Sequence, residues 1–254
     1  MNTPAKTIYP LRGFVVAVVV MSSWFGFVVA GVLEIHPLAG TWWGDLMWAL
    51  ATTWLFIGLF ITAHEAMHGL VLPTHRQRND WVGRLALFLY AGLSYDRLLA
   101  GHIEHHRAPS TEDDPDYWPT NFVGVVGWYI RFLLHYISWV PIFVVATEYT
   151  ILDRIINIDA TRLWMMWLAP QIFSSFQLFY FGTYLPHRPD QPYQGSGSTK
   201  TRSSYYPTWL SLLTCYHFGY HYEHHAYPYV PWWKLPDAVG TQDPQSMSIP
   251  RSLS

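Results

Sequence analysis

The sequence predicts an all-α integral membrane protein with four transmembrane helices, interfacial helices and a histidine-rich cap on the cytoplasmic side. Three observations favour this class. Hydrophobic residues make up 51% of the 254 residues and charged residues only 13%, about half the charged share of soluble proteins. Four stretches are long and apolar enough to cross a bilayer. The 13 histidines gather mainly in short clusters near the ends of these stretches.

The first two predicted spans lie in the N-terminal quarter of the chain. Residues 14–33 are 20 residues without a charge, and as a helix they would be about 30 Å long, the thickness of the hydrocarbon core. After a short turn at residues 34–41, residues 46–63 form a second run without a charge. This run ends at the first histidine cluster, so we expect His64 and His68 at or just beyond the membrane face.

The segment between the second and third spans is polar or amphipathic. Residues 70–80 are polar and contain Arg76 and Arg78. Residues 81–99 are apolar with three interrupting charges, a pattern that predicts an interfacial or partly re-entrant helix. This helix leads into the histidines that begin at His102. Residues 110–120 then form an acidic loop.

The C-terminal half contains the other two predicted spans. The third is residues 132–149, with a kink at Pro141, and the fourth is residues 163–185, which contain Pro170. A short outer connection joins them. Residues 191–204 are rich in glycine, serine and threonine and predict a flexible segment.

The distribution of basic residues predicts the orientation. Of the 15 lysines and arginines, only Arg154 and Arg162 lie in the predicted outer loops, so the other 13 lie on the side of the termini. The positive-inside rule then places both termini and every histidine cluster in the cytoplasm. Residues 205–216 are apolar but short and predict an interfacial segment, and residues 240–254 predict a flexible tail. We expect residues 1–254 to form one domain.

Three histidine clusters recur with the spacing of neighbouring positions on a helix face. Neutral imidazole is the commonest metal ligand in proteins, and it binds without first losing a proton. If the last cluster is helical, its four histidines all lie on one face. The clusters are His64-Glu65-Ala66-Met67-His68, His102-Ile103-Glu104-His105-His106 and His217-Phe218-Gly219-Tyr220-His221-Tyr222-Glu223-His224-His225.

Together the clusters predict one site with two metal ions, and thus a di-metal cap. Roughly eight to ten imidazoles exceed the six or so ligands that a single ion takes. Cys215 is the only cysteine, so a thiolate cage is excluded. Nitrogen ligands without thiolates suit iron that reacts with O2. A site at the mouth of a membrane bundle would give a lipid-dissolved substrate direct access. The reaction that would need a centre with two metal ions is abstraction of hydrogen from an unactivated or allylic C–H bond.

The histidines outside the His-x-x-His-His motifs differ in their expected roles. His187 lies just past the fourth predicted span, near the clusters, and we interpret it as a metal ligand. His217 either binds metal or orients a ligand from behind. We expect His36, in an outer loop, to be structural, His75 to be solvated and His135 to hydrogen-bond a neighbouring helix.

Several carboxylates accompany the histidines. Glu65, Glu104 and Glu223 each lie inside a cluster, where a carboxylate commonly holds a ligand imidazole in the right tautomer. The acidic run at residues 113–116 is either a solvated loop or, through Asp116, a contact to the ligands or a gate for the substrate.

The first cluster also matches the zinc-protease pattern His-Glu-x-x-His, in which Glu65 would be the general base. This alternative uses two histidines, His64 and His68, and leaves the other clusters without a role. It therefore remains a competing hypothesis with a narrower basis.

The histidine pattern resembles the integral-membrane fatty-acid desaturase and hydroxylase superfamily over about residues 46–233. The matching elements are His64-x-x-x-His68, His102-x-x-His105-His106, the single His187 and His221-x-x-His224-His225. Other segments resemble bacterial and cyanobacterial β-carotene ketolases more closely. They are His68-Gly69, Asp114-Pro115-Asp116, Tyr184-Leu185-Pro186-His187-Arg188-Pro189, and the run from His217 to His225 followed by Pro231-Trp232-Trp233.

The resemblance implies a di-iron oxygenase that uses two Fe²⁺ ions and O2 to introduce ketones at the 4 and 4′ carbons of β-ionone rings. Two hydroxylations and a dehydration would convert β-carotene to echinenone and canthaxanthin, and zeaxanthin to astaxanthin. Desaturase relatives often have asparagine where this chain has Thr183, and His217 could supply the missing contact. The implied ligands are His64, His68, His102, His105, His106, His187, His221, His224 and His225.

The resemblance also implies location in the bacterial cytoplasmic membrane and a separate electron donor, such as reduced ferredoxin, because the sequence contains no flavin or ferredoxin module. A carotenoid ring hydroxylase and a membrane acyl-lipid desaturase are the nearest alternatives. A haem-binding cytochrome fits less well, since its paired histidines would lie deep in facing spans. The net charge of −2 implies no nucleic-acid partner.

Overall fold

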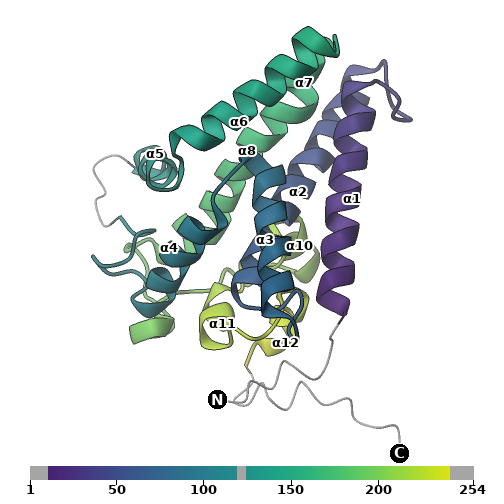
Figure 1. Cartoon of the computed structure of the whole chain (residues 1–254). Helices are drawn as coiled ribbons and strands as arrows, with labels where there is room; N and C mark the ends of the chain where they lie inside the picture. Colours follow the sequence, from purple (N-terminus) through teal and green to yellow (C-terminus); the bar gives the residue numbers. More distant parts are fainter. Residues whose placement is uncertain (1–10, 119–123, 241–254) are drawn as a thin grey trace, which may run out of the picture.

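The computed structural model describes residues 11–118 and 124–240, and this part of the chain is helical and without strands (Figure 1). Most of the predicted tail, residues 241–254, lies outside the described residues. The α-helices are α1 (Arg12–Val32), α2 (Trp42–Met67), α3 (Arg76–Ala91), α4 (Tyr95–Arg107), α5 (Gly124–Tyr136), α6 (Trp139–Thr150), α7 (Ala160–Leu163), α8 (Ala169–Leu178), α9 (Leu185–His187), α10 (Thr208–Cys215), α11 (His221–Ala226) and α12 (Leu235–Ala238). The π-helical turns are η2 (Ile151–Ile155), η3 (Trp164–Leu168) and η4 (Phe179–Tyr184), and the 3₁₀ turns are η5 (Gly197–Thr199) and η6 (Trp232–Lys234).

Two of the described helices, α1 and α2, are long and apolar enough to cross a membrane. A third span is counted if α5 and the Trp139–Ile155 helix form one broken span, although these two pieces are bent by 90°. Figure 1 shows α5 lying across the direction of α6. The elements from α7 to α9 follow one another without a break, so residues 160–187 form one helical rod of mixed α and π turns.

The third predicted span, residues 132–149, was expected to be a single helix with a kink at Pro141. In the structure the break lies earlier, at Ile137 and Ser138, and Pro141 belongs to the first turn of α6. Proline is well accommodated there because the first turn of a helix needs no hydrogen bond from its nitrogen. The prediction of one kinked helix was therefore wrong in both the place and the size of the bend.

Helix α2 is the centre of the bundle and packs against α1, α3 and α8. Its C-terminal half is almost completely buried, from Leu55 to Met67 apart from Phe60. Gly58 permits a close approach of neighbouring elements in this core. A Cβ at Gly58 would lie 2.5 Å from the Tyr216 hydroxyl and 2.8 Å from a Val20 methyl carbon, so a larger residue would push these elements apart.

The predicted amphipathic helix at residues 81–99 is two helices, α3 and α4. Gly92 ends α3 in the left-handed conformation (φ 65°), which glycine adopts without a steric cost. Ser94 then caps α4 by accepting a hydrogen bond from the Arg97 backbone N–H. The break turns the chain so that α4 carries its histidines to the same end of the bundle as α11 (Figure 1).

The last histidine cluster is not a continuous helix. Tyr216 and His217 both have left-handed backbone angles (φ 47° and 63°), and α11 begins only at His221. The expectation that four histidines share one helix face was therefore wrong for His217. Three of the four, His221, His224 and His225, do belong to one short helix.

The opposite end of the bundle is held together by polar contacts. The Arg162 guanidinium contacts Asp45 at 2.9 Å and also contacts Glu34. His36 lies 3.1 Å from the other Asp45 carboxylate oxygen and stacks on Trp48. The structural role expected for His36 agrees with these contacts.

Candidate metal centre

Nine histidines from four segments of the chain meet at one end of the bundle and form two groups. In each group every residue offers a ring nitrogen, and these nitrogens lie within 4.8 Å of one another. The five-histidine group contains His64, His68, His102, His106 and His224, and the four-histidine group contains His105, His187, His221 and His225. The structure thus brings together nine of the ten histidines that the sequence indicated as ligands.

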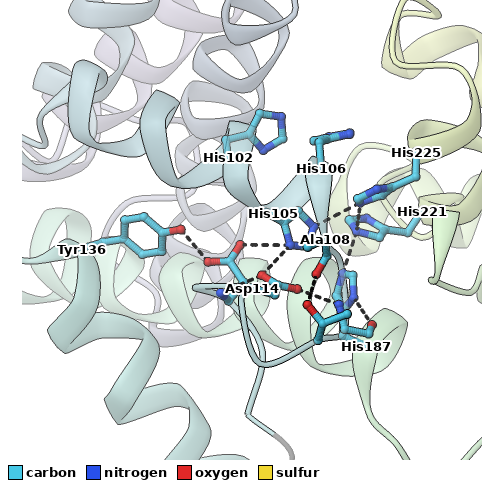
Figure 2. A network of polar contacts seen from close by, with 12 residues as sticks. His102, His105, His106, Ala108, Asp114, Tyr136, His187, His221 and His225 are labelled. Carbon is cyan, nitrogen blue, oxygen red and sulfur yellow. Dashed lines mark hydrogen bonds and ion pairs between the residues drawn. The ribbon is translucent and has the colours of Figure 1, made fainter. Parts of the chain in front are cut away.

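Helical spacing explains how each His-x-x-His-His motif serves both groups. On α4, His102 and His106 are four residues apart and point to the five-histidine group, while His105 turns to the other. Helix α11 does the reverse, because His221 and His225 join the four-histidine group and His224 joins the five-histidine group. The two groups are therefore interleaved rather than separate. Figure 2 shows His102 and His106 of the first group beside the four histidines of the second.

The spacing between ring nitrogens suits shared metal ions. The Nε2 atoms of His68 and His102 are 2.7 Å apart, and those of His187 and His221 are 2.9 Å apart. His225 Nε2 lies 3.1 Å from the Nε2 atoms of both His105 and His221. Two imidazole nitrogens bound at right angles to one ion, each about 2.1 Å from it, would be separated by about 3 Å. The distances within both groups agree with this value.

His64 gives independent support for metal binding. Its side chain is buried, and neither ring nitrogen has a hydrogen-bond partner among the described residues. A buried polar atom without a partner is costly, and a ligand bond to a metal ion would relieve that cost. The donor set in both groups is nitrogen only, which fits a borderline metal such as iron or zinc.

Burial keeps most of these rings neutral. It lowers the pKa of His221, His224 and His225 well below the ordinary value, and the neighbouring imidazoles lower it further. His105 is different. Burial by itself lowers its pKa, but the hydrogen bond and negative charge of Asp114 outweigh that effect and raise it. Neutral rings have a free lone pair, so the groups are ready to bind metal.

Hydrogen bonds on the far side of the rings orient the four-histidine group. His105 Nδ1 donates to Asp114 at 2.9 Å, and His225 Nδ1 donates to the Ser198 carbonyl at 3.1 Å. His187 Nδ1 lies 2.8 Å from the Ser110 hydroxyl. These contacts leave Nε2 of each ring facing the group, as Figure 2 shows for His105, His187 and His225.

Asp114 is the carboxylate that the sequence interpretation underestimated. It is 2% exposed and accepts three hydrogen bonds, from His105 and from the backbone N–H groups of Ser110 and Asp116. The signal was present in the Asp114-Pro115-Asp116 motif, but the acidic loop could not show which aspartate is turned inward. Ser110 and the Ser198 carbonyl had no signal in the sequence.

The other carboxylates occupy different positions. Asp116 accepts a hydrogen bond from Tyr136 at 2.5 Å, and one of its oxygens lies 3.8 Å from His105 Nδ1. Burial raises the pKa of Asp116 to about 6. Glu223 is buried and accepts hydrogen bonds from Ser203 and Tyr205.

All three glutamates were expected to hold ligand rings, but the hydrogen bonds of Glu223 go to Ser203 and Tyr205 instead. Glu65 is buried on α2, and its Oε2 has no hydrogen-bond partner among the described residues. The Glu104 side chain is exposed on α4. Neither glutamate belongs to the metal-binding groups that occur in the described part of the chain.

His217 lies outside both groups. Its Nδ1 is buried without a hydrogen-bond partner among the residues that the structure describes, and its ring lies near those of Trp232 and Tyr220. Of the other single histidines, His75 is exposed at the start of α3, and His135 is exposed on α5.

A cavity of about 840 Å³ adjoins the metal centre, near the upper end of the range for small-molecule pockets. At one end it is bordered by His64, His102, His105 and His221. Its walls are mainly apolar or aromatic, and Asp116 is the only charged side chain among the described residues that line it. A reactive centre next to such a cavity suits a large apolar substrate.

The chain matches the fatty acid desaturase family model over residues 40–162 and 157–241. It is 45% identical to a β-carotene ketolase of Paracoccus sp. (strain N81106 / MBIC 01143) over 194 residues, 74% of this chain and 76% of that protein. It is 44% identical to a β-carotene ketolase of Paracoccus sp. (strain PC1) over 79% of each chain, and 37% identical to a zeaxanthin 4-ketolase of Chlamydomonas reinhardtii over 89% of this chain and 53% of that protein. The chain therefore belongs to the fatty acid desaturase family, and within it the chain is a homologue of the β-carotene ketolases.

Proposed function

We propose that this protein is a β-carotene 4-ketolase, an O2-dependent di-iron oxygenase that introduces ketones at the 4 and 4′ carbons of β-ionone rings. The observation that carries the proposal is the pair of interleaved histidine groups at the end of an apolar cavity. The ketolase homologues favour a carotenoid as the molecule that occupies this cavity.

The residues present fit two iron ions. The five-histidine group would hold one ion and the four-histidine group the other, and His217 remains a candidate to orient a ligand. When bound, the irons would supply the activation of O2 for C–H oxidation. Zinc would fit the nitrogen donors equally well, but it has no redox chemistry and could not support an oxygenase.

The protein's own residues position the site and shield it. Asp114, Ser110 and the Ser198 carbonyl fix the tautomers and orientations of three ligand rings. Phe60 and Phe218 line the cavity beside the histidines, and such apolar walls keep water from a reactive oxidant. Asp116 and Tyr136 also line it, and as a joined pair they can hold a proton close to the reacting ring.

The carbon chemistry explains why an oxygenase can yield a ketone. Each hydroxylation converts one allylic C–H bond at the 4 carbon to C–OH and consumes one O2, two electrons and two protons, with release of one water. A second hydroxylation at the same carbon gives a geminal diol, which loses water to form the ketone. β-Carotene would yield echinenone and then canthaxanthin, and zeaxanthin would yield astaxanthin.

The electrons would come from a separate protein, for which reduced ferredoxin is our candidate. We also propose that residues 160–187 and the α5–α6 pair complete a four-span bundle together with α1 and α2. Both termini and the metal centre would then lie on the cytoplasmic side of the bacterial inner membrane, as the distribution of basic residues predicts.

Expression of the chain in cells that make β-carotene tests the proposal. We expect echinenone and canthaxanthin, and a red shift of the pigment, because ring ketones extend the conjugated polyene. A carotenoid ring hydroxylase would instead yield hydroxylated rings without a colour change, and an acyl-lipid desaturase would leave the pigment unaltered. Activity that depends on zinc and on Glu65 alone would favour the zinc-protease alternative. That alternative uses only His64 and His68, whereas these two histidines share their group with three further histidines.

A further inference from the structure

The cavity has two ends that lie far apart along the bundle. One end is at the metal centre, where Thr183 and His221 line it, and the other is at the ends of α6 and η3, where Thr150 and Trp164 line it. Thr183 and Trp164 belong to the same helical rod and are 19 residues apart, which corresponds to at most about 28 Å. This length is close to the thickness of the hydrocarbon core, about 30 Å, and is comparable with that of an extended carotenoid.

The walls between these ends come from two helices that face each other. Helix α6 contributes Ile142, Val145 and Ala146, and the opposite rod contributes Leu168 and Ile172. The side chain of Ile142 is 52% exposed and that of Ile172 is 50% exposed, and Ala146 is exposed as well. Because these residues both line the cavity and are exposed, the cavity is a cleft that is open along one side. In a membrane this side faces lipid, so a dissolved polyene can enter it without crossing water.

We propose that the cleft between α6 and residues 164–175 holds the polyene and the second ring of the carotenoid, while the first ring lies at the metal centre. The second ring then lies at Tyr149, Thr150 and Trp164, which we call the distal subsite. This inference rests on the proposed ketolase function and assigns the residues that bind the part of the substrate that is not reacting.

The symmetry of the substrate gives the distal subsite a role in product choice. In the first reaction the ring in the distal subsite is unmodified. Before the second reaction the monoketone turns end for end, so the distal subsite must then hold a ring that carries a ketone. The Tyr149 hydroxyl is a donor for that ketone oxygen. The Thr150 hydroxyl donates to the Ala146 carbonyl at 2.7 Å and can still accept a hydrogen bond from a hydroxylated ring.

The first experiment fills the cleft. Ala146→Trp adds bulk to an exposed lining residue, and Thr147→Trp places the same side chain at its exposed neighbour, which does not line the cavity. We expect Ala146→Trp to reduce both ketone formation and the β-carotene that co-purifies with chelator-treated protein by about tenfold or more, while Thr147→Trp retains both. Ala146→Leu should give an intermediate loss. Equal ketone formation and equal amounts of co-purified β-carotene in the two tryptophan variants would overturn the proposal that the cleft binds the substrate.

The second experiment tests the distal subsite through the product ratio. Tyr149→Phe should raise the ratio of echinenone to canthaxanthin about threefold or more, because the ketone ring loses a donor while the unmodified ring loses none. Tyr180→Phe, on the same bundle but outside the cavity, should leave the ratio unchanged. An unchanged ratio in Tyr149→Phe would refute the distal subsite. Absence of any ketone from the wild-type protein would instead refute the proposed function, so the two failures are distinguishable.

Discussion

Replacement of Asp114 by asparagine tests how the protein holds the metal centre from behind. The change preserves the shape of the side chain but removes its charge and turns one acceptor into a donor. In the structure one Asp114 oxygen accepts from His105 and from the Asp116 N–H, and the other accepts from the Ser110 N–H at 2.8 Å. An asparagine amide can satisfy only one of these two sides, so its NH₂ group must face a donor on the other.

The magnitude follows from these contacts. A hydrogen bond to a charged group contributes about 1.5–3 kcal/mol, and a buried N–H group left without an acceptor costs about 1–3 kcal/mol. Loss of a partner that orients a ligand histidine typically reduces metal affinity by about 10–100-fold. His105 belongs to the four-histidine group. We therefore expect Asp114→Asn to lower the affinity of that group for its ion, so that this ion is lost more easily than the ion in the five-histidine group.

Iron retention during a chelator titration measures this effect. Asp114→Asn should release about half of its iron at chelator concentrations that leave the wild-type protein loaded, and its turnover should fall with the iron. Asp113→Asn is the matched control, because Asp113 is in the same loop but exposed. Equal iron retention in the two variants would refute the reasoning.

Three further predictions follow from the described contacts. His224→Ala should abolish turnover in carotenoid-producing cells, whereas His36→Ala should keep it because His36 lies at the opposite end of the bundle; full activity in the first variant would defeat the ligand assignment. Gly58→Ala should lower the Tm, with a loss of about 1–3 kcal/mol of stability, because its Cβ would lie 2.5 Å from a tyrosine hydroxyl, whereas Gly26→Ala, with no atom within 4 Å, should not. Iron-free protein should lose stability as the pH falls below about 6.5. Histidines of the unfolded chain take up protons in this range, whereas buried histidines of the folded protein, such as His225, resist protonation because burial lowers their pKa. A Tm that is independent of pH between 7 and roughly 5 would contradict this.

The sequence predicted that the histidine clusters come together, but not how they divide into two groups. The i, i+4 pairs of α4 and α11 each share one group, as helical geometry requires. The sequence could not predict where regular spacing stops being helical. The left-handed angles at Tyr216 and His217 remove His217 from the α11 face, and neither of these two residues is a glycine that would have signalled such angles.

Breaks within predicted helices were harder to predict than the presence of the helices. Gly92 was a visible signal for a break between α3 and α4, but a single glycine within a helical pattern is often tolerated. The 90° bend between α5 and α6 had no such signal, because Pro141 suggested a kink four residues too late. Tertiary contacts also selected Asp114 rather than Asp116 as the partner of His105, a choice that two similar side chains in one loop do not reveal.

The metal content of the anaerobically purified protein tests the central claim most directly, namely that two interleaved histidine groups each hold one iron. The account predicts two irons per chain, falling to about one after His187→Ala, because His187 belongs only to the four-histidine group. A single iron in the wild-type protein, or zinc in place of iron in an active preparation, would contradict it.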